Sequence, residues 1–583
     1  MKYNLTKLQR DVVNSDGRII LKSCPGSGKT FVVANKILKE MNDWKQKNKG
    51  IALLSFTNIA SKEMEKQINK IYIGYKIGYP HYLGTLDSFI SRYIFLPFGD
   101  LIMECDKRPS IIQEYSVSVN QYAKKIWRRE CYRKGCLPLE FSYDSKNNLK
   151  YKNKIISDCR IKLRNPCVQF KRYCFKHGYA TYSDVISIAI KILRKYPNIS
   201  KLLCGRFPYV IIDEAQDTSK EQMEILEILC ECGLKNVMLI GDPDQAIYEW
   251  RDADPSVFLN KYQDKRWNPK LLNENFRCSQ RICNATKIFS TLPNISKAAG
   301  ETSDYKFKPQ IVKYSIDKKK DLIEYFLKVC KDNRIEINEK NVAVLVRGKT
   351  ELLEKDYSQI KDLWQSPLAK LLSEASFEKW NKSVKRLVNL IERALYSLYI
   401  CCDYDNIIEE EKIEKKIPLD VWHKLIFEFC KNIPDGSLVL KEWKEKVIHL
   451  ISKITDEYDL DIVGNSEVKI KSRTRNKKLQ DFLQQSVKDF YAKAYNLGYL
   501  NTTIHSVKGR TFEAVLLIIA RNGKLTSNLI NTKPIESEPV RTAYVAMTRA
   551  RKILVVGIPK SIKNKSMVRF PIKDWEYHKL SGS

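Results

Sequence analysis

Short apolar runs recur along the chain, and several are followed by segments with the apolar spacing of an amphipathic helix. Such runs are residues 18–22, 51–54, 207–212, 237–241, 342–346 and 515–520. Their length and composition are typical of strands buried on both faces of a parallel sheet. Residues 31–38 and 59–68 have helical spacing. Because strands that alternate with helices predict a parallel sheet covered by helices, we expect an α/β fold.

Two long stretches lack this alternation. Residues 101–204 are basic, aromatic and helical in pattern, which favours an inserted subdomain. Residues 356–499 also have helical spacing, with helices expected at Trp380–Leu398 and Val421–Phe429. We therefore expect two mainly helical insertions in the α/β framework.

Length and charge narrow the class of protein. The chain has 583 residues, too many for one hydrophobic core, and Lys plus Arg outnumber the acids by 102 to 68. A net charge of +34 favours a polyanionic partner with salt-sensitive binding. The alternative is lysine enrichment from a low-GC genome, which the abundance of Ile, Asn and Lys also fits. The motifs decide for nucleic acid.

Compartment follows from what precedes the first motif. The glycine-rich turn begins within the first 25 residues, which leaves no room for a signal peptide, and no apolar run reaches membrane-spanning length. Sixteen scattered cysteines suit a reducing cytosol, so we expect a cytoplasmic protein that does not bind a membrane. The cysteines at 131, 136, 159, 167 and 174 share one region, but their spacing matches no ligand pattern, and free thiols are the preferred interpretation.

The central motif is a glycine turn between a strand and a helix. It comprises Ser23, Cys24, Pro25, Gly26, Ser27, Gly28, Lys29 and Thr30. Such a turn directs backbone N–H groups and a helix N-terminus at a polyphosphate. Lys29 would reach the β- and γ-phosphates, and the Thr30 hydroxyl would bind Mg²⁺. The strict pattern has Gly where this chain has Ser23.

Three further signals belong with a nucleotide. Gln9 lies upstream of the turn, and its amide offers the donor and acceptor that adenine requires, although a helix-surface Gln is commoner. Asp213 and Glu214 follow a buried strand, which suits a Mg²⁺ ligand and a base for the attacking water. Gln245 follows the next strand and is placed to sense the γ-phosphate. Trp250 and Arg251 offer a stacking face and a backbone contact to single-stranded nucleic acid.

Together the motifs resemble those of superfamily 1 helicases of the UvrD/Rep/PcrA type. In order they are Gln9, S-C-P-G-S-G-K-T (23–30), S-F-T-N (55–58), D-E-A-Q-D (213–217), G-D-P-D-Q-A-I-Y-E-W-R (241–251), N-F-R (275–277), H-S-V-K-G-R-T-F-E (505–513) and R-T-A-Y-V-A-M-T-R-A (541–550). They span nearly the whole chain.

The resemblance implies two RecA-like P-loop NTPase domains that hold ATP and Mg²⁺ between them. Arg277 and Arg549 would be arginine fingers, and Phe276 would stack on adenine in place of the usual Tyr. Phe56, Thr57, Asn58, Trp250 and Arg251 would contact single-stranded DNA, and His505 would couple the ATP cleft to the DNA. Movement would be 3′ to 5′.

The same resemblance implies a division of the chain. The expected parts are domain 1A (1–100 and 205–275), the insertion 1B (101–204), domain 2A (276–355 and 500–575), a 2B-like insertion (356–499) and a tail (576–583). The basic stretch 469–478 is either a duplex contact or, by preference, a solvated loop.

Two departures from the family concern single side chains. Asp87 stands where housekeeping helicases have His, which puts one DNA contact in doubt. Thr511 replaces a Glu that contacts the ribose, with Glu513 two residues later, so that contact cannot be assigned.

More particularly, the G-T-L-D-S-F element (84–89) and the N-F-R-C element (275–278) are similar to GajB-type helicase subunits of Gabija anti-phage defence. That resemblance implies a GajA-like partner nuclease of the OLD family, with ATPase and TOPRIM domains, and DNA single strands, junctions or ends as substrate. Three alternatives remain: a DNA-sensing ATPase that activates a nuclease and scarcely unwinds, a housekeeping repair helicase, and a phosphotransferase acting on small molecules.

Overall fold

The computed structural model describes the ranges 5–42, 44–71, 77–112, 141–144, 148–151, 154–155, 171–248, 254–315, 318–348, 351, 364–400, 413–464, 466–470, 484–489, 491, 498–520, 537–562 and 570–580. The chain divides into two compact units, which are described separately: residues 1–351 with 502–583, and residues 352–501.

The first sheet has six parallel strands in the order β11-β1-β10-β9-β2-β3. They are β1 (Arg18–Ser23), β2 (Ile51–Ser55), β3 (Tyr82–Thr85), β9 (Tyr209–Ile212), β10 (Asn236–Gly241) and β11 (Asn268–Leu272). The strands β2 and β9 are buried at every position, as the apolar runs predict.

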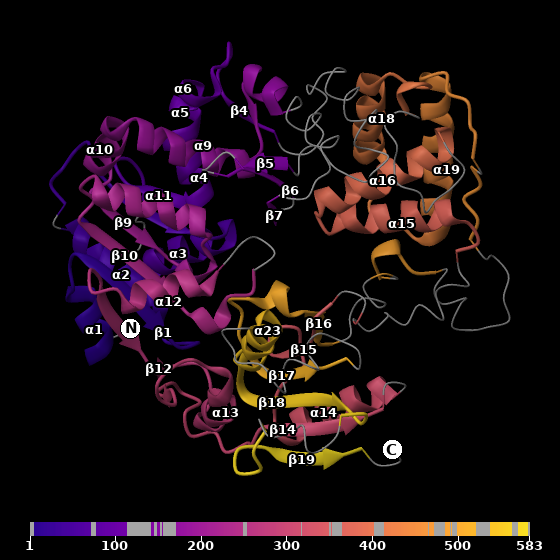
Figure 1. Ribbon diagram of the computed structural model, residues 1–583. Coiled ribbons are helices and arrows are strands. Elements are labelled where there is room, and N and C mark those ends of the chain that lie inside the picture. Colours follow the sequence, from indigo (N-terminus) through magenta and orange to yellow (C-terminus); the bar gives the residue numbers. More distant parts are fainter. Residues whose placement is uncertain are drawn as a thin grey trace. The chain divides into compact units, whose positions relative to one another are not determined.

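Helices cover both faces of this sheet (Figure 1). They are α1 (Lys7–Asn14), α2 (Lys29–Asn42), α3 (Asn58–Ile71), α4 (Leu86–Ile90), α9 (Tyr182–Lys195), α10 (Pro197–Arg206), α11 (Lys220–Glu231) and α12 (Pro255–Gln263). The apolar faces of α1, α2 and α3 share one core with β1, β2, β9 and β10, whereas α9 and α11 pack in the core on the other face.

The second sheet has the order β16-β15-β17-β18-β14-β19, and the pairings among the last five strands are parallel. Its strands are β14 (Gln310–Tyr314), β15 (Val342–Val346), β16 (Leu500–Thr503), β17 (Phe512–Ile518), β18 (Ala550–Pro559) and β19 (Glu576–Lys579). The helices α13 (Gln280–Thr286), α14 (Lys319–Asp332) and α23 (Glu538–Met547) belong to it. Two parallel six-stranded sheets flanked by helices confirm the predicted α/β class.

The stretch predicted as a helical insertion at 101–204 holds more than helices. Besides α9 and part of α10, its described residues form an antiparallel sheet of β5 (Phe141–Tyr143), β6 (Leu149–Tyr151) and β7 (Lys154–Ile155). These strands are two or three residues long, too short for an alternating pattern to reveal. Of the clustered cysteines, those at 131, 136, 159 and 167 lie outside the described residues.

The second unit is helical. It contains α15 (Pro367–Trp380), α16 (Val384–Tyr399), α18 (Leu419–Asn432) and α19 (Leu440–Glu457) around one core. Within the described ranges, no helix is long and apolar enough to cross a membrane. Most of the basic stretch 469–478 lies outside those ranges.

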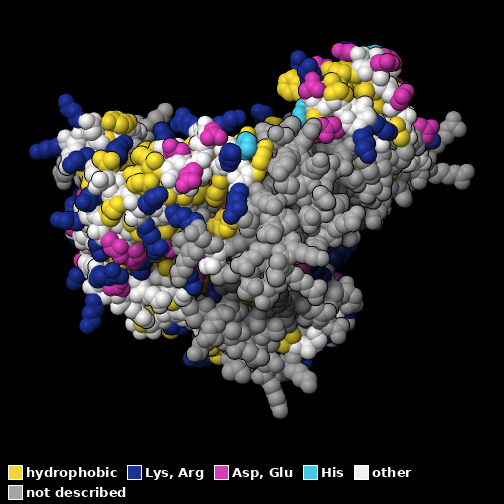
Figure 2. Space-filling view, turned by 45° about the horizontal axis from the view of Figure 1, so that its top comes forward, with side chains coloured by type: hydrophobic (Ala, Val, Ile, Leu, Met, Phe, Trp, Pro, Cys, Tyr) yellow, Lys and Arg dark blue, Asp and Glu magenta, His cyan; other side chains and the backbone are white. Residues whose placement is uncertain are grey.

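On the face shown in Figure 2, the Lys and Arg side chains of the described residues are spread among acidic and apolar ones instead of forming one patch.

Candidate functional site

The glycine turn has the backbone that its sequence predicts. Gly26 and Gly28 have φ angles of 72° and 79°, in the left-handed region that favours glycine. A Cβ atom on Gly26 would lie 2.6 Å from the Cβ of Arg277, so a side chain there would collide with the segment that carries the predicted arginine finger. Lys29 and Thr30 open α2 directly after the turn.

Ser23 has a structural role where the strict pattern has glycine. The side chain is buried, and its hydroxyl donates to the carbonyl of Gly241 at 3.1 Å. This bond joins the ends of β1 and β10, from which the glycine turn and the loop to Gln245 depart. The departure from the pattern therefore adds a link between these two loops.

Gln9 also contacts the glycine turn. Its amide nitrogen donates to the carbonyl of Ser27 at 3.2 Å, and its amide oxygen accepts from the backbone N–H of Thr6 at 3.2 Å. The second bond belongs to a capping box that starts α1. An adenine at this position would take over bonds that now hold the turn.

The predicted carboxylates lie next to the turn. Asp213 is buried and follows β9, and its side chain accepts from the backbone N–H of Glu214 at 2.9 Å. Gln216 holds the Glu214 carboxylate by an N–H···O bond of 2.5 Å. Burial, and then the charge of Glu214, raise the pKa of Asp213. Burial opposes it, but Lys29 and then Lys508 lower the pKa of Glu214, so the pKa values of the two carboxyl groups are shifted in opposite directions.

Gln245 connects the two halves of the first unit. Its amide nitrogen donates to Asp242 at 2.5 Å, and its amide oxygen accepts from Nη2 of the buried Arg549 at 2.7 Å. Arg277 reaches the same place from another segment, where its Nη1 donates to the carbonyl of Thr548 at 3.2 Å. Burial, and then the nearby Arg277, lower the pKa of Arg549. Two guanidinium groups thus stand close enough to repel, beside the glycine turn.

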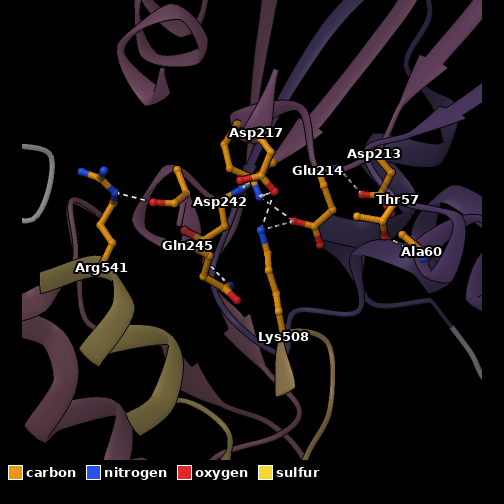
Figure 3. Close-up of polar contacts among 12 residues, drawn as sticks. Thr57, Ala60, Asp213, Glu214, Asp217, Asp242, Gln245, Lys508 and Arg541 are labelled. Atoms are coloured by element: carbon orange, nitrogen blue, oxygen red, sulfur yellow. Dashed lines mark hydrogen bonds and ion pairs between the residues drawn. The ribbon is translucent and has the colours of Figure 1, made fainter. Parts of the chain in front are cut away.

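Lys508 was missed by the sequence analysis. Figure 3 shows its ammonium group directed at Asp217 and Glu214. It forms an ion pair with the buried Asp217, lies 3.9 Å from Glu214, and stands 4.7 Å from the ring centroid of Tyr248. The H-S-V-K element contained the signal, but its lysine was not given a role. Arg541, also missed, is buried and donates from Nε to the carbonyl of Ala246 at 2.6 Å (Figure 3).

The predicted DNA contacts meet at a residue that the sequence analysis passed over. Tyr248 lies 5.3 Å from Phe56 and 6.3 Å from His505 between ring centroids. Thr57 accepts from the backbone N–H of Ala60 at 3.1 Å and so starts α3, whose first residue, Asn58, is exposed. Trp250 and Arg251 lie outside the described residues.

Asp87 and Glu513, which belong to the two departures from the family pattern, both form contacts with other side chains. Asp87 accepts from the amide of Gln222 at 2.6 Å, which ties α4 to α11. Glu513 pairs with Arg551 at 3.3 Å and with Lys552 at 2.9 Å, whereas Thr511 is exposed. The carboxylate of Glu513 therefore already has two cationic partners.

The fold and these residues are those of a nucleotide-hydrolysing protein with two parallel β-sheets, each flanked by helices. The family description of the UvrD/REP helicase N-terminal domain matches residues 5–266, and that of the UvrD-like helicase C-terminal domain matches residues 271–561. The chain belongs to the UvrD/Rep family of ATP-dependent DNA helicases.

Curated relatives that match this chain over most of their length support the same family. The chain is 23% identical to the ATP-dependent DNA helicase Rep of Buchnera aphidicola, over 92% of this chain and 90% of that protein. It is equally similar, at 23%, to the Gabija protein GajB of Bacillus cereus, over 94% of both chains. The ATP-dependent DNA helicase PcrA of Staphylococcus epidermidis is also 23% identical, over 95% of this chain and 83% of that protein. The comparison favours none of these three over the others.

Proposed function

We propose that ATP is hydrolysed between the two sheets of the first unit and that this reaction moves the protein 3′ to 5′ along single-stranded DNA. The bond between Gln245 and Arg549 carries the proposal, because it connects the loop after β10 with the end of α23 on the other sheet. A nucleotide bound there would contact both sheets and couple its hydrolysis to their movement.

The nucleotide is held from three directions in this proposal. Backbone N–H groups of residues 26–30 bind the phosphates, and Lys29 neutralises their charge. Gln9 and the half-buried Phe276 bind adenine. Phe276 also donates its backbone N–H to the carbonyl of Gly26 at 2.9 Å, so the adenine contact and the phosphate contact share one support.

The donor set fits Mg²⁺. The Thr30 hydroxyl and the Asp213 carboxylate are the hard oxygen ligands that this ion prefers. Asp213 is buried beside another carboxylate, an arrangement that a divalent cation would stabilise. Mg²⁺ held by these two residues would supply positive charge that neutralises the phosphates during phosphoryl transfer.

The remaining residues act on water and on the transferred phosphoryl group. Glu214, ionised and held by Gln216, accepts a proton from the attacking water. Arg277 and Arg549 stabilise the negative charge of the transition state. An anion between them attracts both guanidinium groups and so offsets their mutual repulsion. Gln245, bonded to Arg549, senses whether the γ-phosphate is present.

The DNA contacts adjoin the nucleotide contacts in this proposal. Phe56, Tyr248 and His505 present rings to the bases in this proposal, and Trp250 and Arg251 are further DNA contacts proposed from the sequence alone. Lys508 touches both Tyr248 and the pair Glu214–Asp217. Hydrolysis of the nucleotide beside Glu214 would therefore shift Lys508, and Lys508 would pass that shift to Tyr248 on the proposed DNA-binding surface.

Two variants test the nucleotide roles. Lys29→Ala removes the phosphate contact, and Glu214→Gln keeps the shape of the side chain but removes the base, so DNA-stimulated hydrolysis should fall about 10²-fold or more in each. Lys39→Ala is the matched control, because Lys39 is exposed on the same helix, α2. Normal turnover by either test variant would refute the mechanism.

A second function is favoured by particular observations. The bond from Gln222 occupies Asp87 on the predicted DNA side, and GajB is one of several relatives at 23% identity, with 94% of both chains matched. We therefore propose anti-phage defence, with a GajA-like nuclease that this protein activates on DNA single strands or ends. Strand displacement measured with the protein alone, then with the nuclease, separates a motor from a sensor. Full unwinding without the nuclease would support a housekeeping helicase.

A further inference from the structure

Two hollows lie away from the proposed nucleotide site, at the opposite ends of strands of the first sheet. One, of about 390 Å³, is lined by residues 44–47 and 78–81, and the other, of about 570 Å³, by residues 48–49 and 198–206. These segments precede the strands β2, β3 and β9, whereas the proposed nucleotide and DNA contacts of this sheet, apart from Gln9 in α1, follow a strand. Because the strands are parallel, the two sets of residues lie at opposite strand ends.

Five cations face the hollows. They are Lys45, Lys47, Lys49, Lys201 and Arg206. The described residues that line the hollows include no Asp or Glu. Nη1 of Arg206 is shielded from solvent and has no hydrogen-bond acceptor among the described residues. The described lining of both hollows is therefore positively charged.

Aromatic rings stand beside these cations in fixed positions. Tyr79 is 75% exposed, yet its hydroxyl donates to Asn48 at 3.0 Å and its ring rests on the Arg206 guanidinium at 5.3 Å. Trp44 donates from its indole nitrogen to the carbonyl of Lys49 at 2.8 Å and packs edge-on against His81. The rings are therefore presented without further ordering, which lowers the entropic cost of binding.

The loops that form the hollows are joined by their backbones. Gly50 donates to the carbonyl of Arg206 at 2.9 Å, and a Cβ atom on Gly50 would lie 1.9 Å from the carbonyl oxygen of Pro80. His81 accepts from the backbone N–H of Ile51 at 3.1 Å. Three segments distant in sequence are thus held together around the hollows.

We propose that these hollows are a second binding site for single-stranded DNA. An exposed ring beside Lys and Arg is the combination that binds bases and phosphates together. A flat ring such as Tyr79 gives stacking area to a base, whereas an acidic peptide would use only the charges. The DNA here would be a different segment from the one at Phe56 and Tyr248, since the two surfaces lie at opposite ends of the strands.

The test compares DNA of two lengths in the full chain. Lys47→Glu with Lys49→Glu reverses two charges at the hollows. The control, Lys331→Glu with Lys340→Glu, changes the net charge equally at exposed residues in α14 and in the loop before β15. Affinities for thymidine oligonucleotides of about 10 and about 40 nucleotides are measured by fluorescence anisotropy against salt, since one site covers about 4–16 nucleotides.

We expect the first pair to weaken binding of the long oligonucleotide about tenfold relative to the control pair. Its log–log salt slope should shrink by about 1.4, which corresponds to two lost phosphate contacts. Hydrolysis stimulated by the short oligonucleotide should be the same in both pairs. That readout follows the proposed motor by itself, so failure of the motor and failure of the second site are distinguishable.

Stacking is tested separately at Tyr79. Tyr79→Phe keeps the ring and should bind the long oligonucleotide normally, whereas Tyr79→Ala should weaken it about 5- to 100-fold, the range for loss of one stacked base. Equal affinities of the two charge-reversal pairs at both lengths would overturn the proposal. Binding of polyglutamate, an acidic polymer without bases, is measured in parallel. If the Lys47/Lys49 pair weakened the binding of polyglutamate but not of DNA, the hollows would bind an acidic protein partner instead, and the proposal would be wrong.

Discussion

Lys508 holds two carboxylates and an aromatic ring at once. Its ammonium group is paired with the buried Asp217, lies 3.9 Å from Glu214 and faces Tyr248. Burial would lower its pKa, but Asp217 and then Glu214 raise it, so the side chain stays charged. Removing one partner of a buried pair leaves the other charge uncompensated, which makes this contact costly to break.

We therefore predict different effects of Lys508→Met on stability and on activity. The variant should lose about 3–5 kcal/mol of unfolding free energy, because Asp217 becomes an unpaired buried charge. Adding Asp217→Asn should restore most of that stability without restoring DNA-stimulated hydrolysis. Denaturant unfolding and steady-state ATPase assays measure the two effects. Recovery of full activity in the double variant would show that Lys508 serves only the fold.

The same site shows what single residues reveal before a structure is known. Lys29, Asp213, Glu214 and Gln245 were named from their positions next to a strand or turn, and Arg277 and Arg549 from the family resemblance; the roles of all six stay predictions. Tyr248 and Lys508 belong to equally recognisable motifs, yet their roles depend on contacts between segments about 260 residues apart. Spacing along the chain does not encode such contacts.

At the scale of elements, the break between α15 and α16 is the clearest error of the sequence analysis. One helix was expected from Trp380, whereas α15 ends there and α16 starts at Val384. Lys382 adopts a left-handed conformation with a φ angle of 58° and terminates α15. Periodicity alone could not show this, because the apolar spacing continues across the turn.

Replacing Lys382 by glycine should stabilise the helical unit. A left-handed conformation costs a non-glycine residue about 1–2 kcal/mol, which glycine avoids, but glycine has more freedom in the unfolded chain to lose, and this loss cancels part of the gain. We expect a net gain of about 0.5–1 kcal/mol in unfolding free energy by denaturant titration. Lys453→Gly, at an exposed position inside α19, is the control and should lose about 1 kcal/mol. Loss of stability in both variants would contradict the assigned backbone.

Strands of five or more buried residues were predicted well, and short ones were not. The runs at 18–22, 51–54, 237–241 and 342–346 lie in β1, β2, β10 and β15 within a residue or two. Each is apolar because both faces of a parallel sheet are covered. The strands β5, β6 and β7 have two or three residues each, so pairing geometry and not composition defines them.

At the scale of the whole molecule, residues 352–501 have a hydrophobic core of their own. All members of that core come from this unit, among them Trp364, Trp422 and Trp443, which are buried. The indole nitrogen of Trp443 donates to the Ser376 hydroxyl at 2.8 Å, so α19 and α15 are joined by a specific contact as well as by packing. A segment with its own core has what independent folding requires.

We therefore predict that an isolated fragment of residues 352–501 folds cooperatively. Its buried tryptophans should give blue-shifted fluorescence that moves to the red in one denaturant transition, together with loss of helical circular dichroism. Leu425 is fully buried in α18, whereas Phe427, two residues later, is 68% exposed. Leu425→Asp should abolish the transition, because a buried carboxylate costs more than about 4 kcal/mol, and Phe427→Asp should leave it nearly unchanged. If the unaltered fragment showed no cooperative transition, the unit would depend on the rest of the chain, and its core would not be sufficient for folding.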